Sequence, residues 1–133
     1  MKTLALLSIF LALPLWAGTK ATTCSTTMGG PACSGGDGGL CVNLSWTASS
    51  TQGVTYSIYR GTTSGGESLT PIAQGITGTT WQDNNLPLSA PDLYYYAVAF
   101  LGSLSSIASN ETCAAVPTVI APATNVAAVG QHN

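Results

Sequence analysis

Short stretches with an apolar residue at every second position are the feature that most restricts the fold of this chain. The strongest is LYYYAVAFL at 93–101, and the stretches at 42–46 and 54–58 repeat the pattern. A period of two is typical of a half-buried strand, and no stretch from residue 40 onward keeps the period of an amphipathic helix. Turn-forming residues recur about every 8–12 positions, so the pattern predicts an all-β sandwich of about seven antiparallel strands.

The apolar sides of these stretches are numerous enough to form a single core. Burial of one large apolar side chain contributes about 1.5–3 kcal/mol, so such a set can offset the chain entropy of a small domain. In the 93–101 stretch, the alternation is interpreted with Tyr94 and Tyr96 facing inward. The predicted core comprises Trp46, Tyr56, Ile58, Trp81, Leu86, Tyr94, Tyr96 and Val98.

The N-terminus has the layout of a secretory signal peptide. Lys2 precedes an almost wholly apolar stretch at 4–15, and small residues follow at Ala17 and Ala21. About a dozen apolar residues are too few to span a bilayer, which takes about 20, but they suit a cleaved signal. We therefore predict a signal peptide at 1–17, cleaved between 17 and 21. The remaining chain would be secreted, periplasmic or at the cell surface, without a stable membrane span.

Four cysteines follow the predicted signal, at Cys24, Cys33, Cys41 and Cys113. They include no CxxC pair, and the single histidine, His132, lies near the C-terminus, so the closely spaced ligands of a zinc site are missing. In an exported chain this pattern favours disulfides. The residues alone leave all of the pairings open.

The charge pattern disfavours several classes of partner. Charged residues make up 6% of the chain, and the formal net charge is −2. Without a basic cluster, nucleic acid and anionic membrane surfaces are poor partners. The loop GTTSGG at 61–66 lacks the lysine of a phosphate-binding loop, and SGGDGG at 34–39 lacks the acidic repeat of a calcium loop. We expect no cofactor and no metal.

The sequence also lacks a convincing catalytic set. Asp83 and Asp92 flank one connection, but both occupy ordinary turn positions, where aspartate caps its own backbone. A serine nucleophile needs a base, and His132 alone near the C-terminus cannot complete a triad. The prediction is a protein that is not an enzyme.

Five stretches follow one another between residues 40 and 117: VNLSWTAS, YSIYRGTTSGG, LTPIAQGITGTTWQD, LYYYAVAF and SIASNETCAAVP. In this order they resemble the fibronectin type III modules of bacterial exported proteins. The resemblance implies an immunoglobulin-like β-sandwich at 40–117. A Gly/Ser/Thr/Cys-rich arm at 18–39 precedes it, and a tail at 118–133 follows.

The resemblance assigns positions to individual residues. Trp46 matches the core tryptophan of strand B, and Tyr94 matches the corner tyrosine that bonds back to the preceding turn. Two departures stand out. The stretch from Leu86 to Tyr94 is about two residues longer than in the family, and the residues before Val42 lack the apolar alternation of strand A.

The resemblance also implies a disulfide pairing. Cys41 would open strand B and Cys113 would lie near the end of strand G, at the same pole of the sandwich. The expected pairs are therefore Cys41–Cys113 and Cys24–Cys33.

A binding surface follows from the same alignment of strands. If Tyr56 and Ile58 face inward, Tyr59 faces outward on strand C, and so does Tyr95 on the neighbouring strand F. Together they would form a shallow aromatic platform for a sugar or a protein. The alternative is a cross-strand aromatic pair that only stabilises its sheet.

These observations predict an exported, non-catalytic module for adhesion or scaffolding, whose partner is an extracellular protein or glycan. One alternative is an accessory carbohydrate-binding module. Another is a surface subunit that self-assembles, weakly, by pairing residues 125–129 of the tail with a sheet edge.

Overall fold

The computed structural model describes residues 18–25, 33, 40–87 and 89–116. Every regular element in these ranges is a β-strand, which confirms the all-β prediction. The predicted signal peptide at 1–17 and the predicted tail at 118–133 lie outside the described residues. Within the described part of the chain, no helix has the length and hydropathy needed to cross a membrane.

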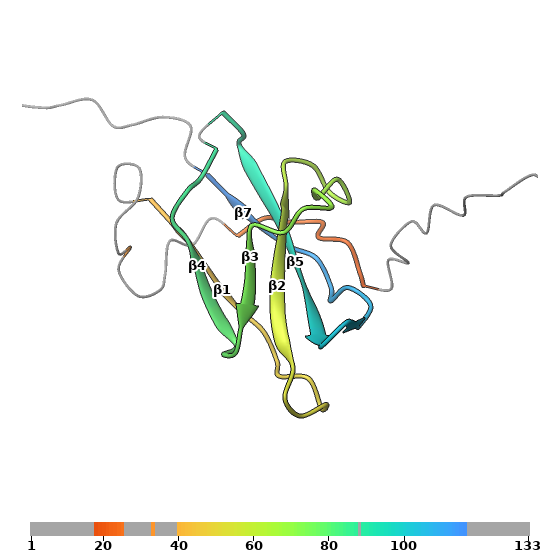
Figure 1. The fold of residues 1–133 in the computed structure, drawn as a ribbon. Coiled ribbons are helices and arrows are strands. Elements are labelled where there is room, and N and C mark those ends of the chain that lie inside the picture. The colour runs from red at the N-terminus through yellow and green to blue at the C-terminus, as the bar shows by residue number, and fades with distance from the viewer. Residues whose placement is uncertain (1–17, 26–32, 34–39, 88, 117–133) are drawn as a thin grey trace, which may run out of the picture.

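The described residues contain seven short strands, all paired antiparallel with their neighbours. They are β1 (Val42–Ser45), β2 (Thr55–Gly61), β3 (Ala73–Ile76), β4 (Thr80–Asp83), β5 (Asp92–Leu101), β6 (Leu104–Ser105) and β7 (Thr112–Ala115). β1 and β4 form a two-stranded sheet. The larger sheet has the order β3–β2–β5, and both β6 and β7 pair with β5 (Figure 1).

The pairing of β2 with β5 determines which side chains reach the core. Ile58 lies opposite Ala97, Tyr59 opposite Tyr96, and Arg60 opposite Tyr95. Directly opposed residues project from the same face of a sheet. Ile58 is buried in the central cluster, so its face is the inner one, and the face of Tyr59 is the outer one.

The predicted inward face of β5 is therefore wrong by one residue. Leu93 and Tyr95 are 0% and 1% exposed and belong to the central cluster. Tyr94, Tyr96 and Val98 lie on the outer face instead, although Tyr96 and Val98 are buried there. Every residue of LYYYAVAFL is apolar or aromatic, so either set of alternate residues could face the core. Only the register with β2 shows which set does.

The other predicted core residues lie on the inner side. Ile58 and Leu86 belong to the central cluster, and the half-buried indoles of Trp46 and Trp81 pack against it. Tyr56 is buried, and its ring meets the Trp46 ring edge-on with 5.4 Å between the centroids. The two sheets are thus joined by indole and phenol rings as well as by aliphatic side chains.

A buried polar network joins the end of β4 to the larger sheet. Asp83, 2% exposed, binds Arg60 through an Nη1–Oδ2 ion pair of 2.7 Å. The Tyr95 hydroxyl donates a hydrogen bond of 3.0 Å to the same oxygen, and Arg60 also donates to the Asn85 carbonyl at 2.6 Å. The tyrosine that bonds back to the preceding segment is therefore Tyr95 and not Tyr94, as the resemblance had implied. Burial, and then the Asp83 carboxylate, raise the pKa of Tyr95 well above its usual range.

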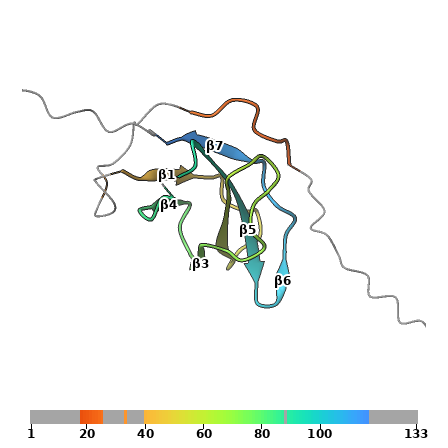
Figure 2. The same ribbon diagram turned by 90° about the horizontal axis from the view of Figure 1, so that it is seen from above.

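The described part of the N-terminal arm, 18–25, lies beside β7 (Figure 2). The Ser25 N–H donates to the Cys113 carbonyl, and the Ala115 N–H donates to the Ser25 carbonyl, both at 3.0 Å. Ser25 forms a parallel bridge with Ala114. An irregular segment, held by a few backbone bonds, thus covers the edge of β7.

Replacement of Tyr95 by Phe should lower the free energy of unfolding by about 1–2 kcal/mol, because a buried hydrogen bond to a carboxylate is lost. The matched change Tyr94→Phe, on the outer face of the same strand, should change it by less than about 0.5 kcal/mol. Urea denaturation followed by tryptophan fluorescence measures both values. A larger loss for Tyr94→Phe would contradict the observed register.

Candidate functional site

The disulfides connect the arm to the sandwich differently from the predicted pairing. Cys24 bonds Cys113, with Cα atoms 4.7 Å apart, and Cys33 bonds Cys41, with Cα atoms 5.6 Å apart. The expected pairs Cys24–Cys33 and Cys41–Cys113 are wrong. Because Ser25 pairs beside Ala114, its neighbour Cys24 is placed next to Cys113. The arm has no strand pattern in its sequence from which this contact could be deduced.

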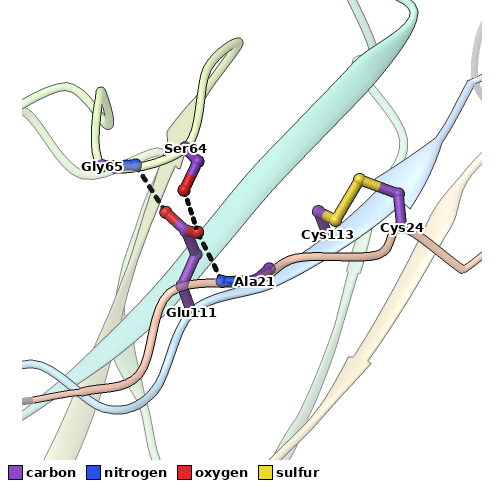
Figure 3. Close-up of a disulfide and its surroundings, with 6 residues drawn as sticks. All are labelled: Ala21, Cys24, Ser64, Gly65, Glu111 and Cys113. Atoms are coloured by element: carbon purple, nitrogen blue, oxygen red, sulfur yellow. Dashed lines mark hydrogen bonds between the residues drawn. A yellow bond between two sulfur atoms is a disulfide. The ribbon is translucent and has the colours of Figure 1, made fainter.

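Glu111 connects three segments close to the Cys24–Cys113 bond (Figure 3). Its carboxylate accepts hydrogen bonds from the Ala21 N–H at 2.8 Å, the Ser64 hydroxyl at 2.7 Å and the Gly65 N–H at 2.6 Å. Its own N–H donates to the Thr19 carbonyl at 3.0 Å. We call this group of contacts the Glu111 clamp, since it holds the arm and the β2–β3 loop against the segment that leads into β7.

The geometry of the loop depends on a glycine. Gly65 has a φ of +71°, a left-handed conformation that side chains rarely adopt, and this conformation presents its N–H to Glu111. A Cβ at Gly65 would also lie 2.5 Å from Lys20 Nζ, because the Lys20 side chain covers the loop. Nothing in the sequence marked Glu111 as a contact residue, because its partners lie far from it in the chain.

A second carboxyl group, Glu67, lies beside the clamp. Both of its side-chain oxygens are buried. Burial, followed by the interaction with Glu111, raises the pKa of Glu67 to about 7, although Lys20 opposes the shift. Burial also acts to raise the pKa of Glu111, but hydrogen bonds from Glu67, Gly65, Ser64 and Ala21 outweigh it and lower that pKa below its usual value. Between pH 4.5 and about pH 7, Glu67 in the folded protein therefore keeps a proton while Glu111 is ionised.

The carboxylates considered as a catalytic pair have different surroundings. Asp83 is bound in the buried network with Arg60 and Tyr95, whereas half-buried Asp92 begins β5 opposite Ala115. Among the described residues, no group of three or more His, Cys, Asp or Glu side chains is placed to hold a metal ion.

One of the two residues predicted for the aromatic platform is wrong. Tyr59 lies on the outer face of β2, but Tyr95 is in the core, so the two rings do not share a face. The ring beside Tyr59 belongs to Tyr96, with 4.8 Å between the centroids and 16° between the ring planes. The stack is a cross-strand pair, which stabilises the sheet and fixes the orientation of the Tyr59 ring.

A shallow groove of about 450 Å³ lies on this outer face. β2 contributes Thr55, Ser57 and Tyr59, and β5 contributes Phe100. Gln74 and Gly75 of the edge strand β3 line the other side, together with Pro71 before that strand and Gly102 after β5. The lining contains no charged residue. We call it the outer groove.

The sheet arrangement decides the fold type. In one layer, β1 and β4 occupy the places of strands B and E of an immunoglobulin-like sandwich. In the other layer, β2, β5 and β7 occupy the places of strands C, F and G. The fold is fibronectin type III-like. A similar solved structure is described as a Fn3-like protein from Clostridium thermocellum, with 29% sequence identity, a TM-score of 0.48 and coverage of 61% of this chain and 81% of that chain. No protein-family model matches the chain, and no curated protein matches it.

Loss of the Cys24–Cys113 bond should destabilise the Fn3-like domain more than loss of Cys33–Cys41. The sequence separations are 89 and 8, for which the loop-entropy model gives about 4–5 and about 2–3 kcal/mol. The double variants Cys24→Ala/Cys113→Ala and Cys33→Ala/Cys41→Ala can be compared by thermal and urea denaturation. Proteolytic mapping of the unreduced protein should yield a peptide that links Cys24 to Cys113. A peptide that links Cys41 to Cys113 would contradict the structure.

Stability should fall as the pH rises from 5 to 8. The pKa of Glu67 is higher in the folded chain than its ordinary value of 4.5, so its contribution is complete below that value and is lost as the pH rises through about 7. For a half-buried group the loss should be about 1–2 kcal/mol after solvent screening. In the Glu67→Gln variant the urea midpoint should stay nearly constant over this range. A decline as steep as that of the unaltered protein would assign the effect to another group.

Proposed function

We propose that the protein is an exported Fn3-like module that binds an extracellular protein or glycan, for adhesion or scaffolding, and acts without turnover. The observation that carries this proposal is the division between the two faces of the larger sheet. On the inner side, Asp83 and its partners serve the fold, and at the edge Glu111 holds the arm. The outer groove remains as a neutral surface on which a partner can rest.

The disulfides support the proposed location. All four cysteines are paired, and disulfides form and persist in oxidising compartments outside the cytosol. A module that works outside the cell also gains from a fixed N-terminal arm, because a loose end is a site for proteolysis. The alternative of self-assembly depends on residues 125–129, which lie outside the described residues.

The proposal predicts saturable binding to material from the surroundings of the producing cell. The oxidised, purified protein would be immobilised and exposed to increasing amounts of cell-envelope preparation and of concentrated culture medium. We expect a binding isotherm that saturates and a retained component whose mass is the same before and after incubation. Absence of saturable retention from both fractions, or steady release of a chemically altered component, would contradict the proposal.

A further inference from the structure

The floor of the outer groove is a row of hydroxyl groups. Thr55, Ser57 and Tyr59 are alternate residues of β2, so their side chains project from the same face, about 6.5 Å apart along the strand. Thr55 and Ser57 are small, whereas Tyr59 and Phe100 are large. Phe100 lies opposite Thr55 at one end and Tyr59 stands at the other, so the groove lies over small side chains between two aromatic rings and spans about 13 Å along β2.

The aromatic wall of the groove is already fixed in place. Tyr59 lines the groove and stacks on Tyr96, which is 7% exposed. Because the stack holds the Tyr59 ring, a ligand that packs against it does not have to order that side chain first. Pro71 and Phe100 add two further apolar surfaces to the lining.

The β3 side of the groove is open and polar. Gln74 is exposed there and presents an amide, which can both donate and accept hydrogen bonds. Beside it, Gly75 has a φ of +69°, and a Cβ built on it would meet no atom within 4 Å. This rim therefore leaves room for a ligand that extends beyond the groove.

The chemistry of the lining selects among ligand classes. A phosphate or a carboxylate would call for cationic partners, and the lining has none. A purely apolar ligand would cover the hydroxyl group of half-buried Thr55 without giving it a hydrogen-bond partner, whereas Ser57 at the floor is already only 6% exposed. An extended peptide would add to the edge of β3, but that edge has an irregular register with β2 and a left-handed glycine, which make it a poor template for a further strand.

A neutral sugar chain satisfies each part of the lining. Its ring hydroxyls match the hydroxyl row and the Gln74 amide, and its C–H faces match the tyrosine and phenylalanine rings. We propose that the outer groove is a binding site for a neutral oligosaccharide segment, with Tyr59 as the stacking residue and Gln74 as the polar contact at the rim. This inference rests on the proposed function and names its ligand class.

Affinity electrophoresis tests this site with defined probes. The full chain would be run in native gels that contain hydroxyethyl cellulose, galactomannan or dextran, with polygalacturonate and heparin as charged controls. We expect at least one neutral polymer, and neither charged one, to retard the protein. Tyr59→Ala and Gln74→Ala should weaken the retardation at least fivefold, and Tyr59→Phe should keep most of it.

The control variant is Tyr94→Ala, which removes a tyrosine from the same face of β5 outside the groove lining. It should stay within twofold of the unaltered protein. Gln74 is exposed on an edge strand, so Gln74→Ala tests the site even if Tyr59→Ala fails to fold. Equal retardation of Gln74→Ala and Tyr94→Ala would overturn the assignment of the site, as would absence of retardation by every neutral polymer.

Failure of this inference can be separated from failure of the proposed function. The envelope material can be treated with protease or with periodate before the binding assay. If protease abolishes the saturable retention and periodate does not, the partner is a protein. That outcome would overturn the sugar site and leave the binding module in place. We expect periodate oxidation, and not protease treatment, to abolish the retention. We also expect the groove variants to weaken it.

Discussion

The register between β2 and β5 is the constraint on which the rest of the molecule depends. It pairs Arg60 with Tyr95 and thereby brings both side chains to Asp83 at the end of β4. The same register pairs Tyr59 with Tyr96 on the opposite face. A shift by one residue would exchange the faces of β5, leave the Asp83 carboxylate without its hydroxyl donor and remove one wall of the outer groove. Core stability and surface chemistry thus share one cause.

The N-terminal arm shows how a segment without a strand pattern can become part of a sheet. Apolar burial contributes little there, because residues 18–25 are mostly exposed or half-buried. The attachment instead combines a disulfide at Cys24, backbone bonds at Ser25 and the Glu111 carboxylate, which accepts from Ala21. These interactions are specific in direction and need few residues. They replace the apolar alternation of strand A that the sequence lacks.

The sequence was informative where one physical signal dominated. The period of two in the stretches around Trp46 and Ile58 predicted the strands, and the order of the stretches predicted the sandwich. It was misleading where two arrangements satisfied the same pattern. LYYYAVAFL has aromatic or apolar residues on both sides, so the choice between Tyr94 and Tyr95 was decided by a long-range pairing. The partner of Cys113 depended in the same way on where the arm lies, a contact between residues far apart in the chain.

The position of the Cys24–Cys113 bond has a mechanical consequence. The two cysteines are 89 residues apart, and β1 to β6 lie between them in the chain. If the segments before Cys24 and after Cys113 are pulled apart, tension passes from one to the other through a single covalent link. Once the bond bears the load, β1 to β6 carry none of it. A tether built in this way can be stretched without unravelling, until a reductant opens the bond.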